Sequence, residues 1–166
     1  MNLCDSLKVV HGENRNATEY CLVCHNPREK DVARRPAGQG APEGIDFSLM
    51  NHRLHTGNLQ SRDYTIFGFG NTPINFNDVV FPGEIANCQN CHLPGTDTVP
   101  IKATLDVTDP RGWLSPVKPA TAACTGCHVT VEAASHALAN TSALGESCAA
   151  CHGEDKDFAV SKVHAR

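Results

Sequence analysis

Four copies of the motif Cys-x-x-Cys-His constrain this chain more than any other feature. They are Cys21-Leu22-Val23-Cys24-His25, Cys88-Gln89-Asn90-Cys91-His92, Cys124-Thr125-Gly126-Cys127-His128 and Cys148-Ala149-Ala150-Cys151-His152. This spacing is typical of c-type haem attachment. Two thiols about one helical turn apart can add to the two vinyl groups of one porphyrin, and the next histidine then reaches the iron. The motifs therefore predict four covalently bound haem c groups.

The predicted haem-binding residues follow directly from the motifs. The thioether bonds are assigned to Cys21, Cys24, Cys88, Cys91, Cys124, Cys127, Cys148 and Cys151, and the proximal iron ligands are His25, His92, His128 and His152. A zinc site or a disulfide framework could use the same cysteines. Neither explains why a histidine follows every cysteine pair, so haem is the preferred interpretation.

Composition favours a fold that is built around the cofactor. Aromatic residues make up only 5% of the chain, whereas it contains 13 glycines and 10 prolines. Such a chain has too few large apolar side chains for an ordinary core, but four apolar porphyrins can take their place. We expect a mostly irregular fold with short α-helices and little or no β structure, wrapped around a chain of haems. The expected organisation is a single tetrahaem domain over residues 1–166, which is either complete or a piece of a longer multihaem protein.

Charge and hydropathy limit the partners and the location. The formal charge is −4, and haem propionates make the holoprotein more negative, which disfavours nucleic acid as a partner. No apolar run reaches transmembrane length, and Met1-Asn2-Leu3 does not resemble a signal peptide. Because haem attachment to this motif normally takes place outside the cytoplasmic membrane, we expect an exported protein in the periplasm, on the outer-membrane surface or outside the cell.

The remaining histidines are candidates for the second axial ligand of each iron. They are His11, His52, His55, His136 and His164, and Met1 and Met50 are the only methionines. An iron with two imidazole ligands is low-spin and has no open position for chemistry. We expect four of these five histidines to be distal ligands, which leaves one to spare.

Local patterns constrain how these histidines are arranged. Residues 46–57 are predicted to form a short helix with Asp46 as N-cap and Gly57 just after its end. His52 and His55 then lie on one face, so we expect them to serve different haems. Residues 124–139 are also predicted to be helical. A rigid helix cannot bring His136 round to the haem of its own motif, so interlaced ligation is expected.

The other segments carry weaker signals. Residues 31–45 read as a polar loop, and residues 64–70 as either a short strand or the lining of a haem edge. Residues 93–123 form a long link with five prolines. Cys4 is the odd cysteine, and its role is open between a free thiol, an intermolecular partner, a remnant of a lost motif and a lipid anchor.

The order of elements resembles one pentahaem domain of the OmcA/MtrC-type outer-surface cytochromes. The similar segments are His11-Gly12-Glu13-Asn14-Arg15, Cys21 to Pro27, Asp46 to Gly57, Phe76 to Gly83 before Asn87 to His92, Ser135-His136 and Val163-His164. In that family a further haem motif precedes the His-Gly element. Here that place holds Asn2-Leu3-Cys4-Asp5, so the chain resembles a family domain whose first haem motif has been lost, cut away or misread. The family carries five distal histidines for five haems, whereas this chain keeps five for four. By position the spare is His11, His52 or His55.

The predicted function is electron transfer along four bis-histidine haems, without catalytic residues. The expected partners are other multihaem cytochromes or copies of the chain itself. The resemblance implies extracellular respiration with metal oxides, metal chelates or flavins as acceptors. One alternative is a haem enzyme with one open iron that reduces a small oxyanion or nitrogen oxide, which the surplus of histidine disfavours. Another is a protomer of an extracellular cytochrome filament.

Overall fold

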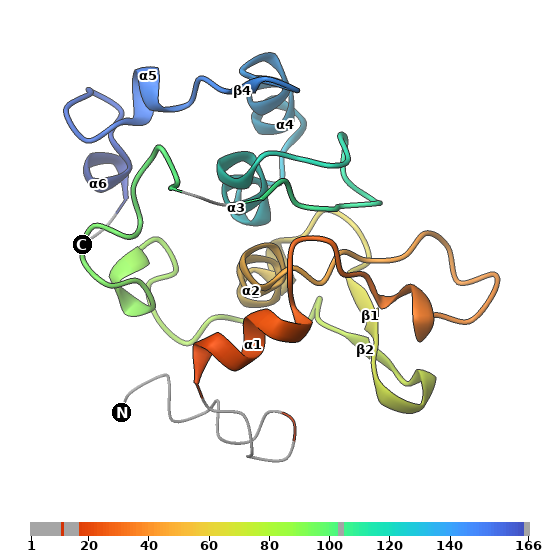
Figure 1. Cartoon of the computed structure of the whole chain (residues 1–166). Helices are drawn as coiled ribbons and strands as arrows, with labels where there is room; N and C mark the ends of the chain where they lie inside the picture. Colours follow the sequence, from red (N-terminus) through yellow and green to blue (C-terminus); the bar gives the residue numbers. More distant parts are fainter. Residues whose placement is uncertain (1–10, 12–16, 103–104, 165–166) are drawn as a thin grey trace.

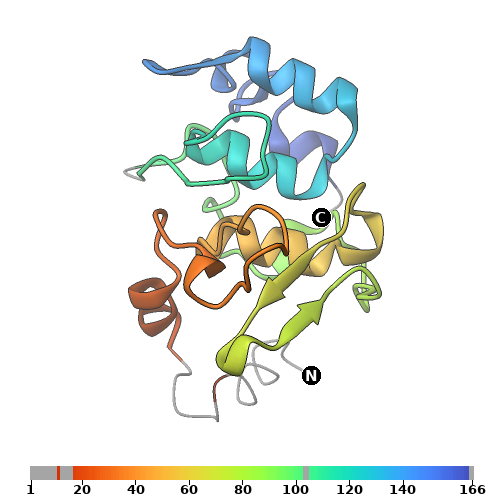
Figure 2. The same cartoon turned by 90° about the vertical axis from the view of Figure 1, so that its right-hand side faces the viewer.

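The chain is arranged in two tiers in the computed structural model, which describes His11, residues 17–102 and residues 105–164. The first tier contains helices α1 and α2 and the β1–β2 hairpin, and the second contains helices α3 to α6 (Figures 1 and 2). Helix α2 packs against α3 where the tiers meet. The contact between α2 and α3 therefore joins the two tiers.

All regular elements are short. The helices are α1 (Thr18–Cys24), α2 (Phe47–His55), α3 (Pro119–Cys127), α4 (Val131–Ala139), α5 (Ala149–His152) and α6 (Val160–Val163). The strands are β1 (Thr65–Phe67), β2 (Pro73–Asn75), β3 (Thr141–Ser142) and β4 (Gly145–Glu146), which form two antiparallel pairs. Short 3-10 turns occur at Asp31–Ala33, Gly57–Leu59, Phe69–Asn71 and Cys88–Asn90. The fold class is thus the predicted one, mostly irregular with short helices and little β structure.

Helix α2 has the predicted boundaries. The Asp46 side chain accepts a hydrogen bond from the backbone N–H of Leu49 at 3.0 Å, as an N-cap should. The helix ends at His55, and Gly57 follows the cap residue Thr56. A Cβ atom on Gly57 would lie 1.8 Å from the carbonyl oxygen of Phe76. The glycine is therefore needed because another segment passes close by.

The predicted single helix over residues 124–139 is wrong. The structure has two helices, α3 and α4, separated at residues 128–130. His128 leaves the helical region with φ −86° and ψ 81°, and the Thr130 side chain accepts a hydrogen bond from the N–H of Ala133 to begin α4. A Thr at this position favours a new helix start. The break turns the chain directly after the third haem motif, which a propensity argument does not reveal.

A small apolar core lies where α2, α3 and the preceding link meet. It consists of Leu49, Val107, Val117 and Ala122, all at most 5% exposed. Val107 and Val117 exchange two backbone hydrogen bonds of 2.7 and 2.8 Å, which fold the link back on itself. Four side chains, one of them an alanine, make a small core for a chain of this length.

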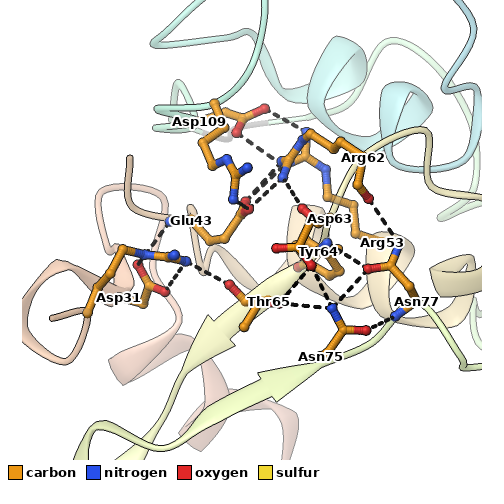
Figure 3. A network of polar contacts seen from close by, with 12 residues as sticks. Asp31, Glu43, Arg53, Arg62, Asp63, Tyr64, Thr65, Asn75, Asn77 and Asp109 are labelled. Atoms are coloured by element: carbon orange, nitrogen blue, oxygen red, sulfur yellow. Dashed lines mark hydrogen bonds and ion pairs between the residues drawn. The ribbon is translucent and has the colours of Figure 1, made fainter. Parts of the chain in front are cut away.

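A buried group of charges supplements this core. The Glu43 carboxylate is completely buried and binds the guanidinium groups of Arg62 (2.9 Å) and Arg111 (2.7 Å). Beside it, Arg53 makes a two-pronged ion pair with Asp109, with distances of 2.6 and 3.1 Å (Figure 3). Such pairs join the first tier to the link before α3. The polar loop over residues 31–45 therefore contributes a buried anchor, which its composition did not indicate.

Candidate haem-binding site

Each of the four motifs lies on a single helical turn. The first ends α1, the second covers a 3-10 turn, the third ends α3 and the fourth spans α5. In all four, the N–H of the motif histidine donates to the carbonyl of the first cysteine, at 2.8 Å for His25 and His128 and at 2.9 Å for His92 and His152. The two cysteines of every motif therefore lie one turn apart, which is the geometry that attachment to one porphyrin requires.

Every motif histidine faces one other histidine. The pairs are His11–His25, His52–His92, His128–His164 and His136–His152, and the ring centres are 6.0 Å apart in each. A histidine nitrogen binds a transition metal at about 2 Å, and a ring centre lies roughly 1 Å behind its nitrogen. Two imidazoles on one iron would therefore have their centres about 6 Å apart. The observed separation fits an iron between each pair and is too wide for direct ring stacking.

Three of the paired histidines are oriented by backbone carbonyl groups. The Nδ1 atom of His25 lies 2.9 Å from the oxygen of Ile45, that of His152 lies 2.9 Å from Phe158 and that of His164 lies 3.1 Å from Val160. A carbonyl accepts only from a protonated Nδ1, so Nε2 keeps its lone pair for a metal. Histidine ligands in metalloproteins are generally held by a second hydrogen bond of this kind.

Two of the pairs also show the electrostatics of facing imidazoles. Burial lowers the pKa of His52, and the facing His92 lowers it further. The pKa of His128 is lowered by burial and then by His164. Both effects favour the neutral imidazole, which is the form that binds iron.

Cysteine thiols of the second, third and fourth motifs interact with one another electrostatically. The pKa of Cys124 is raised to about 11 by burial and then by the Cys148 thiol, with Cys88 among the smaller contributors. Burial and Cys88 likewise raise the pKa of Cys127 to about 11. The thiols of the second, third and fourth motifs are therefore close enough to interact electrostatically.

His55 is the one candidate ligand that is not paired in this way. Among the ring contacts of the described residues, none joins it to a motif histidine, and its ring meets Phe81 edge to face at 5.5 Å. Its Nδ1 atom lies 2.8 Å from the carbonyl oxygen of Asn51. We expected His52 and His55 to ligate two different irons. Of the two, only His52 faces a motif histidine among the described residues. Cys4 lies outside the described residues.

Sequence reasoning missed the contact between helix α2 and the third motif. Gly126, the second residue between Cys124 and Cys127, lies against His52 and receives hydrogen bonds from Thr56 and Gln60. A glycine inside a haem motif is the only sequence signal of this contact, and it does not identify the partner.

No helix among the described residues is long and apolar enough to cross a membrane. Over residues 2–165 the chain matches the family described as outer membrane cytochrome MtrC/MtrF-like, domains II/IV. A comparison with individual curated proteins gives no match. The family match covers nearly the whole chain, including all four motifs and their facing histidines. The chain therefore belongs to the MtrC/MtrF-like outer membrane cytochromes, exported electron-transfer proteins with covalently bound haem c.

Proposed function

We propose that this chain is a tetrahaem electron carrier in which every iron has two histidine ligands. The observation that carries the proposal is the set of four histidine pairs with ring centres 6.0 Å apart, each with one motif histidine. A haem with two imidazole ligands exchanges single electrons and has no open position for a substrate. The chain holds the cofactors by thioether bonds and sets the orientation of their ligands.

The assignment of ligands follows the pairs. The thioether residues are Cys21, Cys24, Cys88, Cys91, Cys124, Cys127, Cys148 and Cys151, the proximal ligands are His25, His92, His128 and His152, and the distal ligands are His11, His52, His164 and His136 in the same order. His55 is the surplus histidine. The second, third and fourth pairs each join separate segments of the chain, so the cofactors would cross-link a fold with a small core.

The electrons pass to and from other redox proteins in this proposal. The partners are other multihaem cytochromes or copies of the same chain, within a single tetrahaem domain that works in outer-surface respiration. Metal oxides, metal chelates and flavins are proposed as terminal acceptors on the strength of the family resemblance alone. The alternative of a reductase for a small oxyanion or nitrogen oxide needs an open iron, and the facing imidazole at every motif argues against one.

The test combines mass and spin state on the secreted holoprotein. Its intact mass should exceed the chain mass by four haems, and the electron paramagnetic resonance (EPR) spectrum of the oxidised protein should contain only low-spin ferric iron. The reduced protein should not bind carbon monoxide. A high-spin signal, or one molecule of carbon monoxide bound per protein, would refute the proposal and favour the reductase.

Helix α2 offers a matched pair of variants for the ligand assignment. His52→Ala should convert one iron to high spin, because it removes the imidazole that faces His92. His55→Ala, three residues away on the same helix, should leave all four irons low-spin at every protein concentration. If His55→Ala also produces a high-spin iron, then His55 is a ligand. A high-spin iron that appears in the wild-type protein only on dilution would mean that His55 ligates an iron of a neighbouring subunit.

A further inference from the structure

The third haem motif packs against helix α2 at Gly126. A Cβ atom at this position would lie 2.6 Å from the Cβ of His52, a distance that real Cβ atoms do not reach. The backbone N of Arg53 lies 3.6 Å from the same point. Helix α2 therefore rests directly on the third motif, and the residue that makes the contact is the predicted distal ligand of the second haem.

Hydrogen bonds fix this contact from the side of α2. The Gln60 side-chain amide donates to the Gly126 carbonyl at 2.8 Å and to the Thr56 hydroxyl at 2.7 Å. The Thr56 hydroxyl lies 2.8 Å from the carbonyl oxygens of both His52 and Gly126, and it can donate to either. Carbonyl groups in the last turn of a helix lack partners within that helix. The Gly126 carbonyl of α3 finds its partners on the segment that follows α2.

The contact is also buried. Thr56 is 1% exposed and Gly126 is buried, so water does not compete for these hydrogen bonds. Displacing either side would leave a buried carbonyl unsatisfied, which costs about 1–3 kcal/mol. The position of α2 relative to the third motif is therefore well defined.

We propose that Gly126, Thr56 and Gln60 are positioning residues that set the electron-transfer distance between the second and the third haem. This inference rests on the ligand assignment proposed above, because it takes His52 as an axial ligand and Cys124 and Cys127 as attachment points. His92 and His128 would hold the irons of these two haems, which would exchange one electron at a time without a proton or a co-reactant. The rate of this exchange falls exponentially with the separation of the two porphyrin edges.

A comparison with the other motifs indicates that Gly126 is required by its contact with α2 and not by haem attachment. The residue equivalent to Gly126 is Val23 in the first motif, Asn90 in the second and Ala150 in the fourth. Haem attachment therefore does not itself require glycine. The side chain of Val23 is 73% exposed, so Val23→Ala provides a matched control that changes the same motif position without touching another haem site.

The experiment compares Gly126→Ala with Val23→Ala in the full holoprotein. Both variants should retain four haems by intact mass. In Gly126→Ala, the low-spin EPR signal of the His52–His92 haem should shift, and electron equilibration between the second and third haems after photoreduction should slow. Val23→Ala should reproduce the wild-type signals and rates. Unchanged signals and rates in Gly126→Ala would overturn the inference.

If Gly126→Ala cannot be produced as a folded holoprotein, a second pair of variants tests the same contact. Thr56→Val removes the hydroxyl and keeps the shape, and it should slow the same equilibration, whereas Thr56→Ser should restore the wild-type rate. If Thr56→Val behaves as wild type, the hydrogen-bonded clamp is refuted. Fewer than four haems or a high-spin iron in the wild-type protein would instead refute the underlying ligand assignment.

Discussion

The two tiers of the molecule are stabilised by different means. The first tier buries large side chains of its own, including Tyr64, Leu49 and the Glu43 carboxylate. In the second tier, beyond Gly126, the buried residues of the described chain are only Ala134, Gly153 and Ala159. These small side chains cannot form a core, yet this tier contains two of the four histidine pairs. If the haems bind as proposed, they supplement the polypeptide core around α2 and α3 and take its place in the segment beyond Gly126.

The largest expected difference between the tiers appears when haem attachment at the fourth motif is prevented. In Cys148→Ala/Cys151→Ala, the amide protons of α4 to α6 should exchange rapidly with solvent, because that tier would lose the apolar group it packs around. The amides of α2 should stay protected. Hydrogen exchange read by mass spectrometry measures both tiers in one sample. Continued protection of α4 to α6 would mean that the second tier has a core of its own.

The buried charges of the first tier provide the next test. Glu43→Ala leaves the guanidinium groups of Arg62 and Arg111 without their buried partner, and removing one member of a buried ion pair costs about 3–5 kcal/mol. Urea unfolding followed by circular dichroism measures this loss. Glu132→Ala, at the exposed first turn of α4, is the control and should lower the unfolding midpoint much less than Glu43→Ala. An equal midpoint for the two variants would refute the stabilising role of the charge group.

The tiers also differ in the angle between facing histidine rings. The ring planes are 30° apart in His11–His25 and 8° apart in His52–His92, but 71° in His128–His164 and 85° in His136–His152. Nearly parallel rings act on the same iron d orbital and separate its energy from that of its partner orbital. Perpendicular rings leave the two orbitals nearly equal in energy.

The EPR spectrum of the oxidised protein should therefore contain two kinds of low-spin iron. Two haems should give rhombic signals, and two should give the single large g value of perpendicular ligands. His164→Ala should remove one of the large-g signals and His52→Ala one of the rhombic signals. Four rhombic signals would contradict the ring angles in the second tier.

The parts that could be predicted from the sequence are those with a local cause. The four motifs, the helix that begins after Asp46 and the scarcity of β structure all follow from spacing, capping and composition. The break between α3 and α4 was missed, because residues 124–139 have good helix propensity throughout and Thr130 begins a new helix within them. The sequence predicts that a distal histidine comes from a different segment than the motif it serves. It does not predict that His55 is the unpaired histidine, because that depends on how α2 packs.

The buried charge group could not be predicted for the same reason. Glu43 lies in a polar loop, and its partners Arg62 and Arg111 are 19 and 68 residues away. Nothing in one sequence distinguishes these residues from solvated surface charges. The contact at Gly126 likewise joins two segments 66 and 70 residues apart, so it becomes visible only in three dimensions.

The smallest expected difference between the tiers concerns their helix caps. Asp46 caps α2 from a buried position and also accepts from the Ser48 hydroxyl at 2.6 Å, whereas Thr130 caps α4 with a 3.2 Å bond from the Ala133 N–H near solvent. Replacement of a cap by alanine costs about 0.5–2 kcal/mol. Asp46→Ala should fall near the upper end of this range, because its loss leaves a buried N–H without an acceptor.

Thr130→Ala should fall near the lower end for two reasons. Water can replace the lost acceptor at this exposed helix start, and the iron bond proposed for His136 would hold α4 in place even when its first turn frays. Urea midpoints of the two variants measure the difference, and Asp46→Asn, which keeps an acceptor oxygen, should recover most of the loss in α2. If Thr130→Ala destabilised the protein as much as Asp46→Ala, the second tier would depend on its own helix ends, and the haem contacts would contribute less than the comparison of the tiers indicates.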